Sequence, residues 1–531
     1  MTVTAPARPR WAWAALLLGL ALLQLALNLH YAAPLVVVGD NDPSYYYTVA
    51  RNVAIGRGLA DPIEWEFLDP HRPGRPERIL RPTAGGGWGF DEVTNRDPPG
   101  VLHGAGAFWS LGWPLFLGAV MSVVGASQKA AIYICAVLST ALPVLVCWLT
   151  YRIRPELWVA GMAGLMAILL EDQNCGKVTP DSGIPYTVAV LAAMCVVDAA
   201  RRQPQRWRWF LAGIAVVVPF CCRGEGFELG LVALWVLLAQ PGVNRRDAFL
   251  SFAVGALITV AGYLLYHWMA FGAFVPKPRS LGLYLTEYND LNRFLVPVTK
   301  ARWLAQGFHV IVQQRWDTLC YRIYRCGTEL PWPIGVLALV GIGIGWRRHR
   351  DGVRLVVGFM LLAWVVTSVL APFLSIGRLA GLIFPEECIL AALAIAALSE
   401  RRRWVGALLL LACVRLYWPA ATPHWNWRGY TAMPPYLALT LQSPLKLTPQ
   451  DLVLTSNPFE VAADLDVQTV TAPADGVPEA FYAVIQAYRP HYMIVQAGST
   501  MAGFQEYTHL AGLHIRPVLQ AADATWYEFI P

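Results

Sequence analysis

The chain has 531 residues, of which 56% are hydrophobic and 14% are charged. Soluble domains carry about 25% charged residues, so this composition excludes a disordered chain, a coiled coil and a water-soluble enzyme. The mean hydropathy of +0.44 leaves a polytopic membrane protein as the remaining class. We therefore interpret the formal net charge of +6 as a marker of topology rather than as a nucleic-acid-binding surface.

Apolar runs follow one another along most of the chain. The first comes directly after Arg8-Pro9-Arg10, and no small-x-small cleavage site follows it closely, so we interpret it as a retained signal anchor. We predict about eleven membrane spans in all, at residues 11–36, 129–150, 157–171, 185–200, 209–222, 226–240, 248–271, 332–346, 353–374, 380–398 and 404–421.

One more run, at 107–126, is ambiguous, and charge decides its status. If it does not cross, every basic cluster falls on the side of the N-terminus, as the positive-inside rule requires. We therefore predict an interfacial or re-entrant helix there. We expect a multi-pass protein of the plasma (inner) membrane, with a cytoplasmic N-terminus and a periplasmic or extracellular C-terminus. The basic clusters lie at 152–154, 201–208, 245–246, 347–354 and 401–403.

This topology divides the chain into a membrane module, residues 1–421, and a polar tail, residues 422–531. The module carries two long outer loops, at 37–128, with interfacial helices, and at 272–331. The tail has the alternating pattern of a small α/β domain. Its predicted strands are 453–455, 467–470 and 492–495, and its predicted helix is 478–488, with Pro near the start.

The segment 39–58, GDNDPSYYYTVARNVAIGRG, directly follows the first span on the predicted outer side. Asp42 followed by Pro43 fits an N-cap with Pro at the first helical position. A carboxylate at a helix N-terminus is also held ionised by backbone N–H groups, which suits a general base. The two interpretations are compatible, and Asp40 is a second candidate for the base.

The same segment resembles the first outer loop of the glycosyltransferase C superfamily, where an acidic residue precedes paired tyrosines, Ala-Arg-Asn and Gly-x-Gly. The likeness is nearest to the bacterial group of protein-mannosyltransferase-like enzymes that includes the aminoarabinose transferases of lipid A. That group commonly has Asp-Glu at this point, whereas this chain has Pro43 in place of the Glu. Further motifs resemble the superfamily in chain order: LGWPLFL at 111–117 with VG at 124–125, TPDS at 179–182, CRGEG at 222–226, FGAFVPK at 271–277, GR at 377–378 before FP at 384–385, and LTSNP at 454–458.

The resemblance implies a polytopic α-helical enzyme that moves a sugar from a polyprenyl-phosphate donor to an envelope lipid, glycan or protein. An inverting transfer needs a base and cations that stabilise the leaving phosphate, and we predict Asp42 as the base, with Asp40 as its substitute. The predicted phosphate-binding residues, each of which could instead be an interfacial anchor, are Arg223, Arg378, Lys277 and Arg279. The residues predicted to position the sugar, the acceptor or a metal are Asp181, Glu225, Tyr46 and Arg51.

Several alternatives stay open. No set of His and acidic residues has clear metal-ligand spacing, so no cofactor is required and a divalent metal stays possible. A transporter or flippase of lipid-linked glycans is a second interpretation, although the chain has no internal repeat and its candidate acids lie in outer loops. A glycan polymerase or ligase centred on 272–331 is a third. Cys320 and Cys326, in that loop, could pair or stay free.

Overall fold

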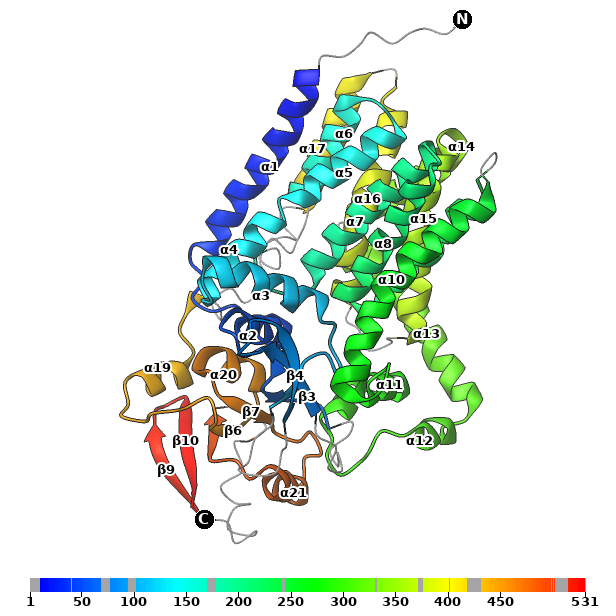
Figure 1. Cartoon of the computed structure of the whole chain (residues 1–531). Helices are drawn as coiled ribbons and strands as arrows, with labels where there is room; N and C mark the ends of the chain where they lie inside the picture. The colour runs from blue at the N-terminus through cyan, green and yellow to red at the C-terminus, as the bar shows by residue number, and fades with distance from the viewer. Residues whose placement is uncertain are drawn as a thin grey trace, which may run out of the picture.

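Figure 1 presents the protein as a computed structural model, in which a long bundle of helices stands on a smaller region that contains the strands. The predicted boundary at residues 421 and 422 lies outside the described part of the chain. The structure describes residues 10–39, 41–67, 77–93, 102–169, 178–240, 244–329, 332–370, 376–400, 402–417, 431–497, 499, 501 and 514–530.

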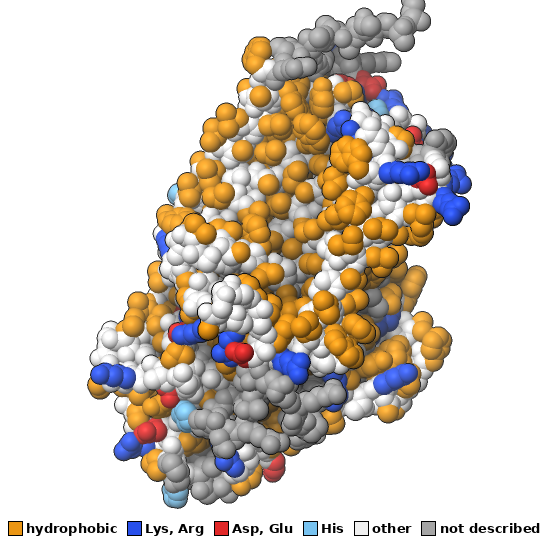
Figure 2. All heavy atoms as spheres, viewed as in Figure 1, with side chains coloured by type: hydrophobic (Ala, Val, Ile, Leu, Met, Phe, Trp, Pro, Cys, Tyr) orange, Lys and Arg blue, Asp and Glu red, His pale blue; other side chains and the backbone are white. Residues whose placement is uncertain are grey.

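The bundle is built from apolar helices, and each predicted span corresponds to a helix, with the second span divided in two. Within the described residues, five stretches are long and apolar enough to cross a membrane: α1, α4 with α5, α7, α10 and α15. Hydrophobic side chains cover the flank of the bundle in Figure 2. The chain is a polytopic α-helical membrane protein, as its composition predicted. The bundle helices are α1 (Arg10–Ala32), α4 (Gln128–Leu138), α5 (Ala141–Ile153), α6 (Leu157–Leu169), α7 (Gly183–Arg202), α8 (Arg206–Cys222), α9 (Phe227–Leu238), α10 (Arg245–Phe271), α14 (Trp332–Arg348), α15 (Arg350–Leu370), α16 (Ile376–Leu398) and α17 (Arg403–Tyr417).

Buried polar side chains hold the break between α4 and α5 against α1. The Gln24 side chain donates to Oδ1 of Asn28 at 2.6 Å. The Nδ2 of Asn28 donates to the carbonyl of Ala136 and to Oγ of Ser139, both at 2.7 Å. Polar groups in a low-dielectric bundle must find partners within the protein. These bonds therefore fix α1, and with it the start of the first outer loop, against the bundle.

The ambiguous run at 107–126 forms α3 (Gly112–Val124), a 13-residue helix. At about 1.5 Å per residue it is about 20 Å long, similar to α6 and α9, so the prediction that it does not cross rests on charge alone. It packs on α2 (Asp42–Ala54), where a Cβ at Gly118 would lie 2.7 Å from the carbonyl oxygen of Ala50. The indole nitrogen of Trp113 donates to the carbonyl of Pro180 at 2.7 Å. Helix α3 thus connects α2 to the loop before α7.

The five tail strands belong to a six-stranded sheet in the order β2-β7-β6-β8-β10-β9, in which β2 is Ile63–Glu64. The predicted tail strands are confirmed as β6 (Leu452–Thr455), β7 (Gln468–Thr471) and β8 (Tyr492–Gln496), and the predicted helix as α21 (Pro478–Tyr488). β6 pairs in parallel with β7 and β8, and β10 pairs antiparallel with β8 and β9. The remaining tail elements are α19 (Pro435–Leu441), α20 (Pro458–Leu465), β9 (His514–Gln520) and β10 (Ala524–Ile530).

The first outer loop contributes a strand to this sheet, which the sequence did not predict. β2 (Ile63–Glu64) pairs in parallel with β7, with Ile63 opposite Thr469. The tail sheet and the first outer loop are therefore one packed unit. The other strands of this loop are β1 (Ala60–Asp61), paired with β5 (His103–Gly104), and β3 (Glu77–Pro82), paired with β4 (Trp88–Val93).

The segment predicted as the loop 272–331 is largely helical. Cys320 and Cys326 both lie on its longest helix, α13, six residues apart, so their Cα atoms are about 9 Å apart along the axis. A disulfide needs a Cα separation of about 4.4–6.8 Å, and Cys320 is a free cysteine. The helices of this segment are α11 (Lys277–Leu281), η2 (Gly282–Tyr284), η3 (Tyr288–Asn292), α12 (Lys300–Ala305) and α13 (Phe308–Glu329).

The close crossing of α8 and α10 tests the packing of the bundle. A Cβ at Gly255 on α10 would lie 2.1 Å from the carbonyl oxygen of Phe210 on α8, whereas a Cβ at Gly262 on the same helix would meet nothing within 4 Å. We expect Gly255→Ala to destabilise the protein by about 1–3 kcal/mol because the two backbones must separate. Gly262→Ala should leave the thermal midpoint in detergent unchanged or raised. Equal midpoints for the two variants would contradict this packing.

Candidate active site

The candidate base lies at the start of α2. Asn41 is the N-cap, with φ 53°, and Asp42 is the first helical residue, followed by Pro43. Asp42 was expected at the cap itself, and the structure moves it one residue into the helix. Its side chain is only 2% exposed. A negative charge at this end of a helix is stabilised by the unpaired backbone N–H groups. Asp40, the substitute candidate, lies outside the described residues.

A buried guanidinium joins two further segments beside α2. Arg223, at the C-cap of α8, donates through Nη1 to Oγ of Ser182 at 3.0 Å and lies 4.0 Å from Oδ1 of Asp181. Its Nη2 lies 3.4 Å from Oε1 of Glu225, in the turn η1 (Gly224–Gly226). A buried charge of this kind is tolerated only when it is paired and hydrogen-bonded. Arg223 therefore holds the loop before α7 against the turn between α8 and α9.

Electrostatics connects α2 to this ion-pair network. Burial raises the pKa of Tyr46 above its ordinary value, and the nearby carboxylate of Asp42 raises it further. Arg223 and the hydroxyl of Ser182 act on the same phenol in the opposite direction. The Tyr46 side chain, four residues after Asp42 on the same face of α2, is thus close enough to both the candidate base and the guanidinium to be affected by their charges.

The charge balance of this cluster is acidic. Burial alone would lower the pKa of Arg223, but Glu225 and Asp181, followed by Tyr46 and Asp42, hold it above its ordinary value. Burial would likewise raise the pKa of Glu225, and the guanidinium of Arg223 keeps it below its ordinary value. Three carboxylates surround one guanidinium, so the cluster favours cationic or hydroxyl-bearing ligands near Asp42 and needs additional cations to hold a phosphate.

Asp181 also acts as a cap. Its Oδ1 accepts hydrogen bonds from the backbone N–H of Gly183 at 2.9 Å and from the hydroxyl of Ser182 at 3.3 Å. These bonds satisfy donors at the start of α7 and fix the carboxylate in place. Ser182 was not among the predicted site residues, although its position just before an apolar run is a typical sign of a helix start.

The predicted cations of α11 lie near the same cluster. Arg279 donates to the carbonyl of Phe108, at 2.8 Å through Nη2, and to the hydroxyl of Tyr263 at 2.6 Å. Its charge also contributes to lowering the pKa of Glu225, after that of Arg223. Lys277, the first residue of α11, is exposed. Arg378 belongs to the first turn of α16, and its side chain lies outside the described residues.

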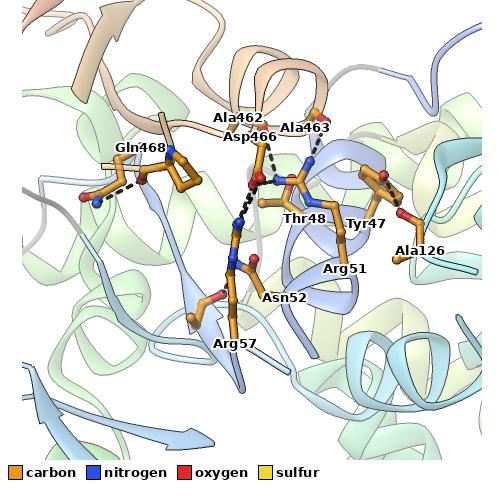
Figure 3. Close-up of polar contacts among 12 residues, drawn as sticks. Tyr47, Thr48, Arg51, Asn52, Arg57, Ala126, Ala462, Ala463, Asp466 and Gln468 are labelled. Atoms are coloured by element: carbon orange, nitrogen blue, oxygen red, sulfur yellow. Dashed lines mark hydrogen bonds and ion pairs between the residues drawn. The ribbon is translucent and has the colours of Figure 1, made fainter. Parts of the chain in front are cut away.

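Arg51 lies apart from the cluster, on the opposite face of α2 from Asp42. Figure 3 shows its guanidinium directed at the C-terminal end of α20. It donates to the carbonyls of Ala462 and Ala463 and binds Oδ1 of Asp466 at 2.6 Å. A cation at a helix C-terminus is favoured by the unpaired carbonyls there. The observed contacts make Arg51 a connection between α2 and the tail, rather than a neighbour of Asp42 and Arg223.

No group of three or more His, Cys, Asp or Glu side chains in the described ranges has the geometry to hold a metal ion. In the first outer loop, Nδ1 of His103 lies 3.9 Å from a carboxylate oxygen of Asp61, and its Nε2 lies 4.0 Å from a carboxylate oxygen of Glu64.

Comparison with solved structures identifies the class of fold. The crystal structure of ArnT from Cupriavidus metallidurans bound to undecaprenyl phosphate is 13% identical, with a TM-score of 0.57 and coverage of 97% of this chain and 98% of that chain. The apo structure of the same protein gives 12% identity and a TM-score of 0.54, and the match covers 98% of each chain. No family model and no curated protein matches the sequence.

The cryo-EM structure of arabinofuranosyltransferase AftD from Mycobacteria is 12% identical, with a TM-score of 0.51. The match covers 99% of this chain and 42% of AftD. These likenesses show the fold, and they agree with the resemblance seen in the sequence. The chain has the fold of ArnT along almost its whole length.

The contact between α2 and α20 offers a matched test. Arg51 and Arg57 both bind Asp466, but only the largely buried Arg51 also binds the helix carbonyls. We expect Arg51→Gln to cost about 1–3 kcal/mol and to speed amide exchange in α20. Arg57→Gln, which removes a more exposed pair, should change exchange little. Equal exchange in α20 for both variants would mean that the Arg51 contacts do not hold the tail.

Proposed function

We propose that this chain is an integral-membrane inverting glycosyltransferase that moves a sugar from a polyprenyl-phosphate donor to an envelope lipid, glycan or protein. The observation that carries the proposal is the meeting of Asp42, Asp181 and Arg223, from three separate segments, at one end of the bundle. The fold adds support, because the ArnT crystal structure contains undecaprenyl phosphate.

Asp42 is proposed as the general base. Its carboxylate takes the proton of the acceptor hydroxyl while that oxygen attacks the anomeric carbon, and the bond from the anomeric carbon to the phosphate oxygen breaks. Its place in the first turn of α2, at the helix N-terminus, favours the ionised form that a base requires. Asp40 is retained as the substitute. Asp181, Glu225 and Tyr46 are proposed to orient the sugar and the acceptor.

The leaving polyprenyl phosphate needs cations. Arg223 was predicted to bind it, but its Nη1 and Nη2 atoms already contact Ser182 and Glu225. We therefore propose that Arg223 acts mainly as a positioning residue for the carboxylates. Lys277, Arg279 and Arg378 are proposed to bind the phosphate. Lys277 is exposed, whereas Arg279 already donates to Phe108 and Tyr263 and would add mainly its charge.

We further propose that the site faces the outside of the cell. The basic clusters lie at the opposite end of the bundle, and the positive-inside rule assigns that end to the cytoplasm. The N-terminus is then cytoplasmic, and the tail sheet beside α2 is periplasmic or extracellular. Donor and acceptor would meet at the outer membrane surface, without nucleic acid.

The role of Asp42 is tested in envelope glycans. We expect Asp42→Asn, which preserves size at the start of α2, to reduce transfer by about 10²–10⁴-fold because no base remains. The measurement is mass spectrometry of envelope glycolipids, glycans and glycoproteins in a deletion strain that expresses the wild type or a variant at equal level.

The exposed Asp523 supplies the control, and Asp523→Asn should restore the product fully. If Asp42→Asn also restores the product fully, Asp42 is not the base. The same measurement on Asp40→Asn would then test the substitute.

The phosphate role of α11 is tested by binding. We expect Lys277→Gln to weaken the binding of undecaprenyl phosphate to the purified protein by about tenfold or more, because a charge-assisted contact is lost. Lys300→Gln removes an exposed lysine at the start of α12 and should have no effect. Binding is measured as the lipid-dependent shift in thermal midpoint. Equal shifts for the two variants would remove Lys277 from the phosphate site.

A further inference from the structure

A second site lies at the other end of the bundle. Helix α7 starts at the candidate active site and ends at Arg202, about 30 Å away for its 20 residues. There, the end of α5, the end of α7 and the junction of α14 with α15 line a cavity of about 620 Å³ that is open to solvent. This volume falls within the roughly 300–1,000 Å³ of small-molecule sites. Six arginines line it: Arg152, Arg201, Arg202, Arg347, Arg348 and Arg350.

The cavity walls carry excess positive charge. Arg152, Arg201 and Arg202 all bind the buried carboxylate of Asp198, at 2.9, 2.8 and 2.8 Å. A single carboxylate therefore neutralises only one of the three positive charges around it. Such crowding of like charges is unfavourable unless a further anion is near.

The remaining wall contains the one carboxylate of the lining, Asp351, which pairs with Arg354 at 3.5 Å. Arg348 pairs with Glu400, whereas Arg347 and Arg350 have no carboxylate within ion-pair distance among the residues described. The guanidinium of Arg350 lies over the ring of Trp346 at 5.6 Å. Burial lowers the pKa of His349, in the same wall, and the charges of Arg154 and Arg348 lower it further, in keeping with a positive field there.

The surroundings of the cavity indicate what the anion is attached to. The cavity lies where the apolar flank of the bundle ends, and Figure 2 shows Lys and Arg gathered at that end. Leu339 on α14, below the cavity, is 70% exposed, as is typical of a lipid-facing side chain. A lipid with its phosphate in the cavity could lay its acyl chains along α14. Basic pockets between membrane helices are known to bind anionic headgroups.

We infer that this cavity binds a phosphate-bearing anion, presented as the headgroup of an anionic membrane phospholipid. Arginine suits the role because its planar fork binds two phosphate oxygens at once. Positive charge on loops would by itself satisfy the positive-inside rule, but it would not require six arginines around one cavity. The site is separate from the candidate active site and does not depend on the proposed reaction.

The test uses the full chain in neutral detergent, titrated with phosphatidylglycerol, phosphatidylcholine or inorganic phosphate and followed by thermal midpoint. We expect phosphatidylglycerol alone to stabilise the wild type. The double variant Arg347→Gln/Arg350→Gln, which breaks no ion pair with a described carboxylate, should weaken that binding by about 30-fold. Arg206→Gln/Arg208→Gln removes two charges at the same end but outside the cavity lining, and should retain wild-type binding.

Three results would overturn the inference. Equal stabilisation by phosphatidylcholine would show that headgroup charge is not recognised. Stabilisation by inorganic phosphate at the same concentration would assign the cavity to a free anion. An equal loss of phosphatidylglycerol binding in both double variants would show that the lipid is attracted by diffuse surface charge and not by the cavity.

Amide exchange of the wild type gives a readout that needs no variant. Phosphatidylglycerol, compared with phosphatidylcholine, should protect the junction of α14 and α15 and the end of α7. If protection appears elsewhere and not there, the cavity is not the binding site.

Discussion

The burial of one guanidinium sets the geometry of the candidate active site. Arg223 is only 6% exposed at the end of α8, and a charge in such a place must be surrounded by acceptors. Ser182, Asp181 and Glu225 provide them, and each comes from a place where a helix starts or the chain turns. The loop before α7, the turn after α8 and the start of α2 therefore meet at one point. Losing one partner of such a network typically costs about 3–5 kcal/mol.

Helix α2 connects the cluster around Arg223 to the tail. One face presents Asp42 and Tyr46 to the cluster around Arg223, and the other is fixed to α20 by Arg51. The backbone N–H of Asn41 also donates to Glu460 of α20 at 3.1 Å. A shift of the tail sheet would thus move the candidate base directly. This arrangement gives the tail a structural role, since it supports the helix that carries the candidate base.

Local and periodic features of the fold were predictable from sequence. The apolar runs predicted the bundle helices, charge placement separated α3 from the spans, and Pro478 marked the start of α21. The acidic and basic residues near span ends predicted most of the cluster, because ionisable groups at such places need partners. Their roles in transfer stay proposals.

Pairings between distant segments were not predictable. β2 is two residues long and joins a sheet some 400 residues away in sequence, and the partner of Arg51, Asp466, is 415 residues away. No local pattern contains such contacts. Asp42 was predicted at the N-cap of α2, whereas Asn41, with a positive φ, is the N-cap and Asp42 is the first helical residue. The segment 272–331 was taken as a loop because α13 has no long apolar run; its apolar residues recur at helical spacing with polar residues between them.

Photo-crosslinking with a diazirine-bearing polyprenyl phosphate, mapped by mass spectrometry, tests the central claim most directly. If the three segments form the donor site, label should appear near the start of α2, in residues 178–183, in the turn 223–226 and in α11. An excess of unlabelled undecaprenyl phosphate should remove it. Label confined to the arginine-lined cavity at the other end of the bundle, or to the tail sheet, would contradict the account.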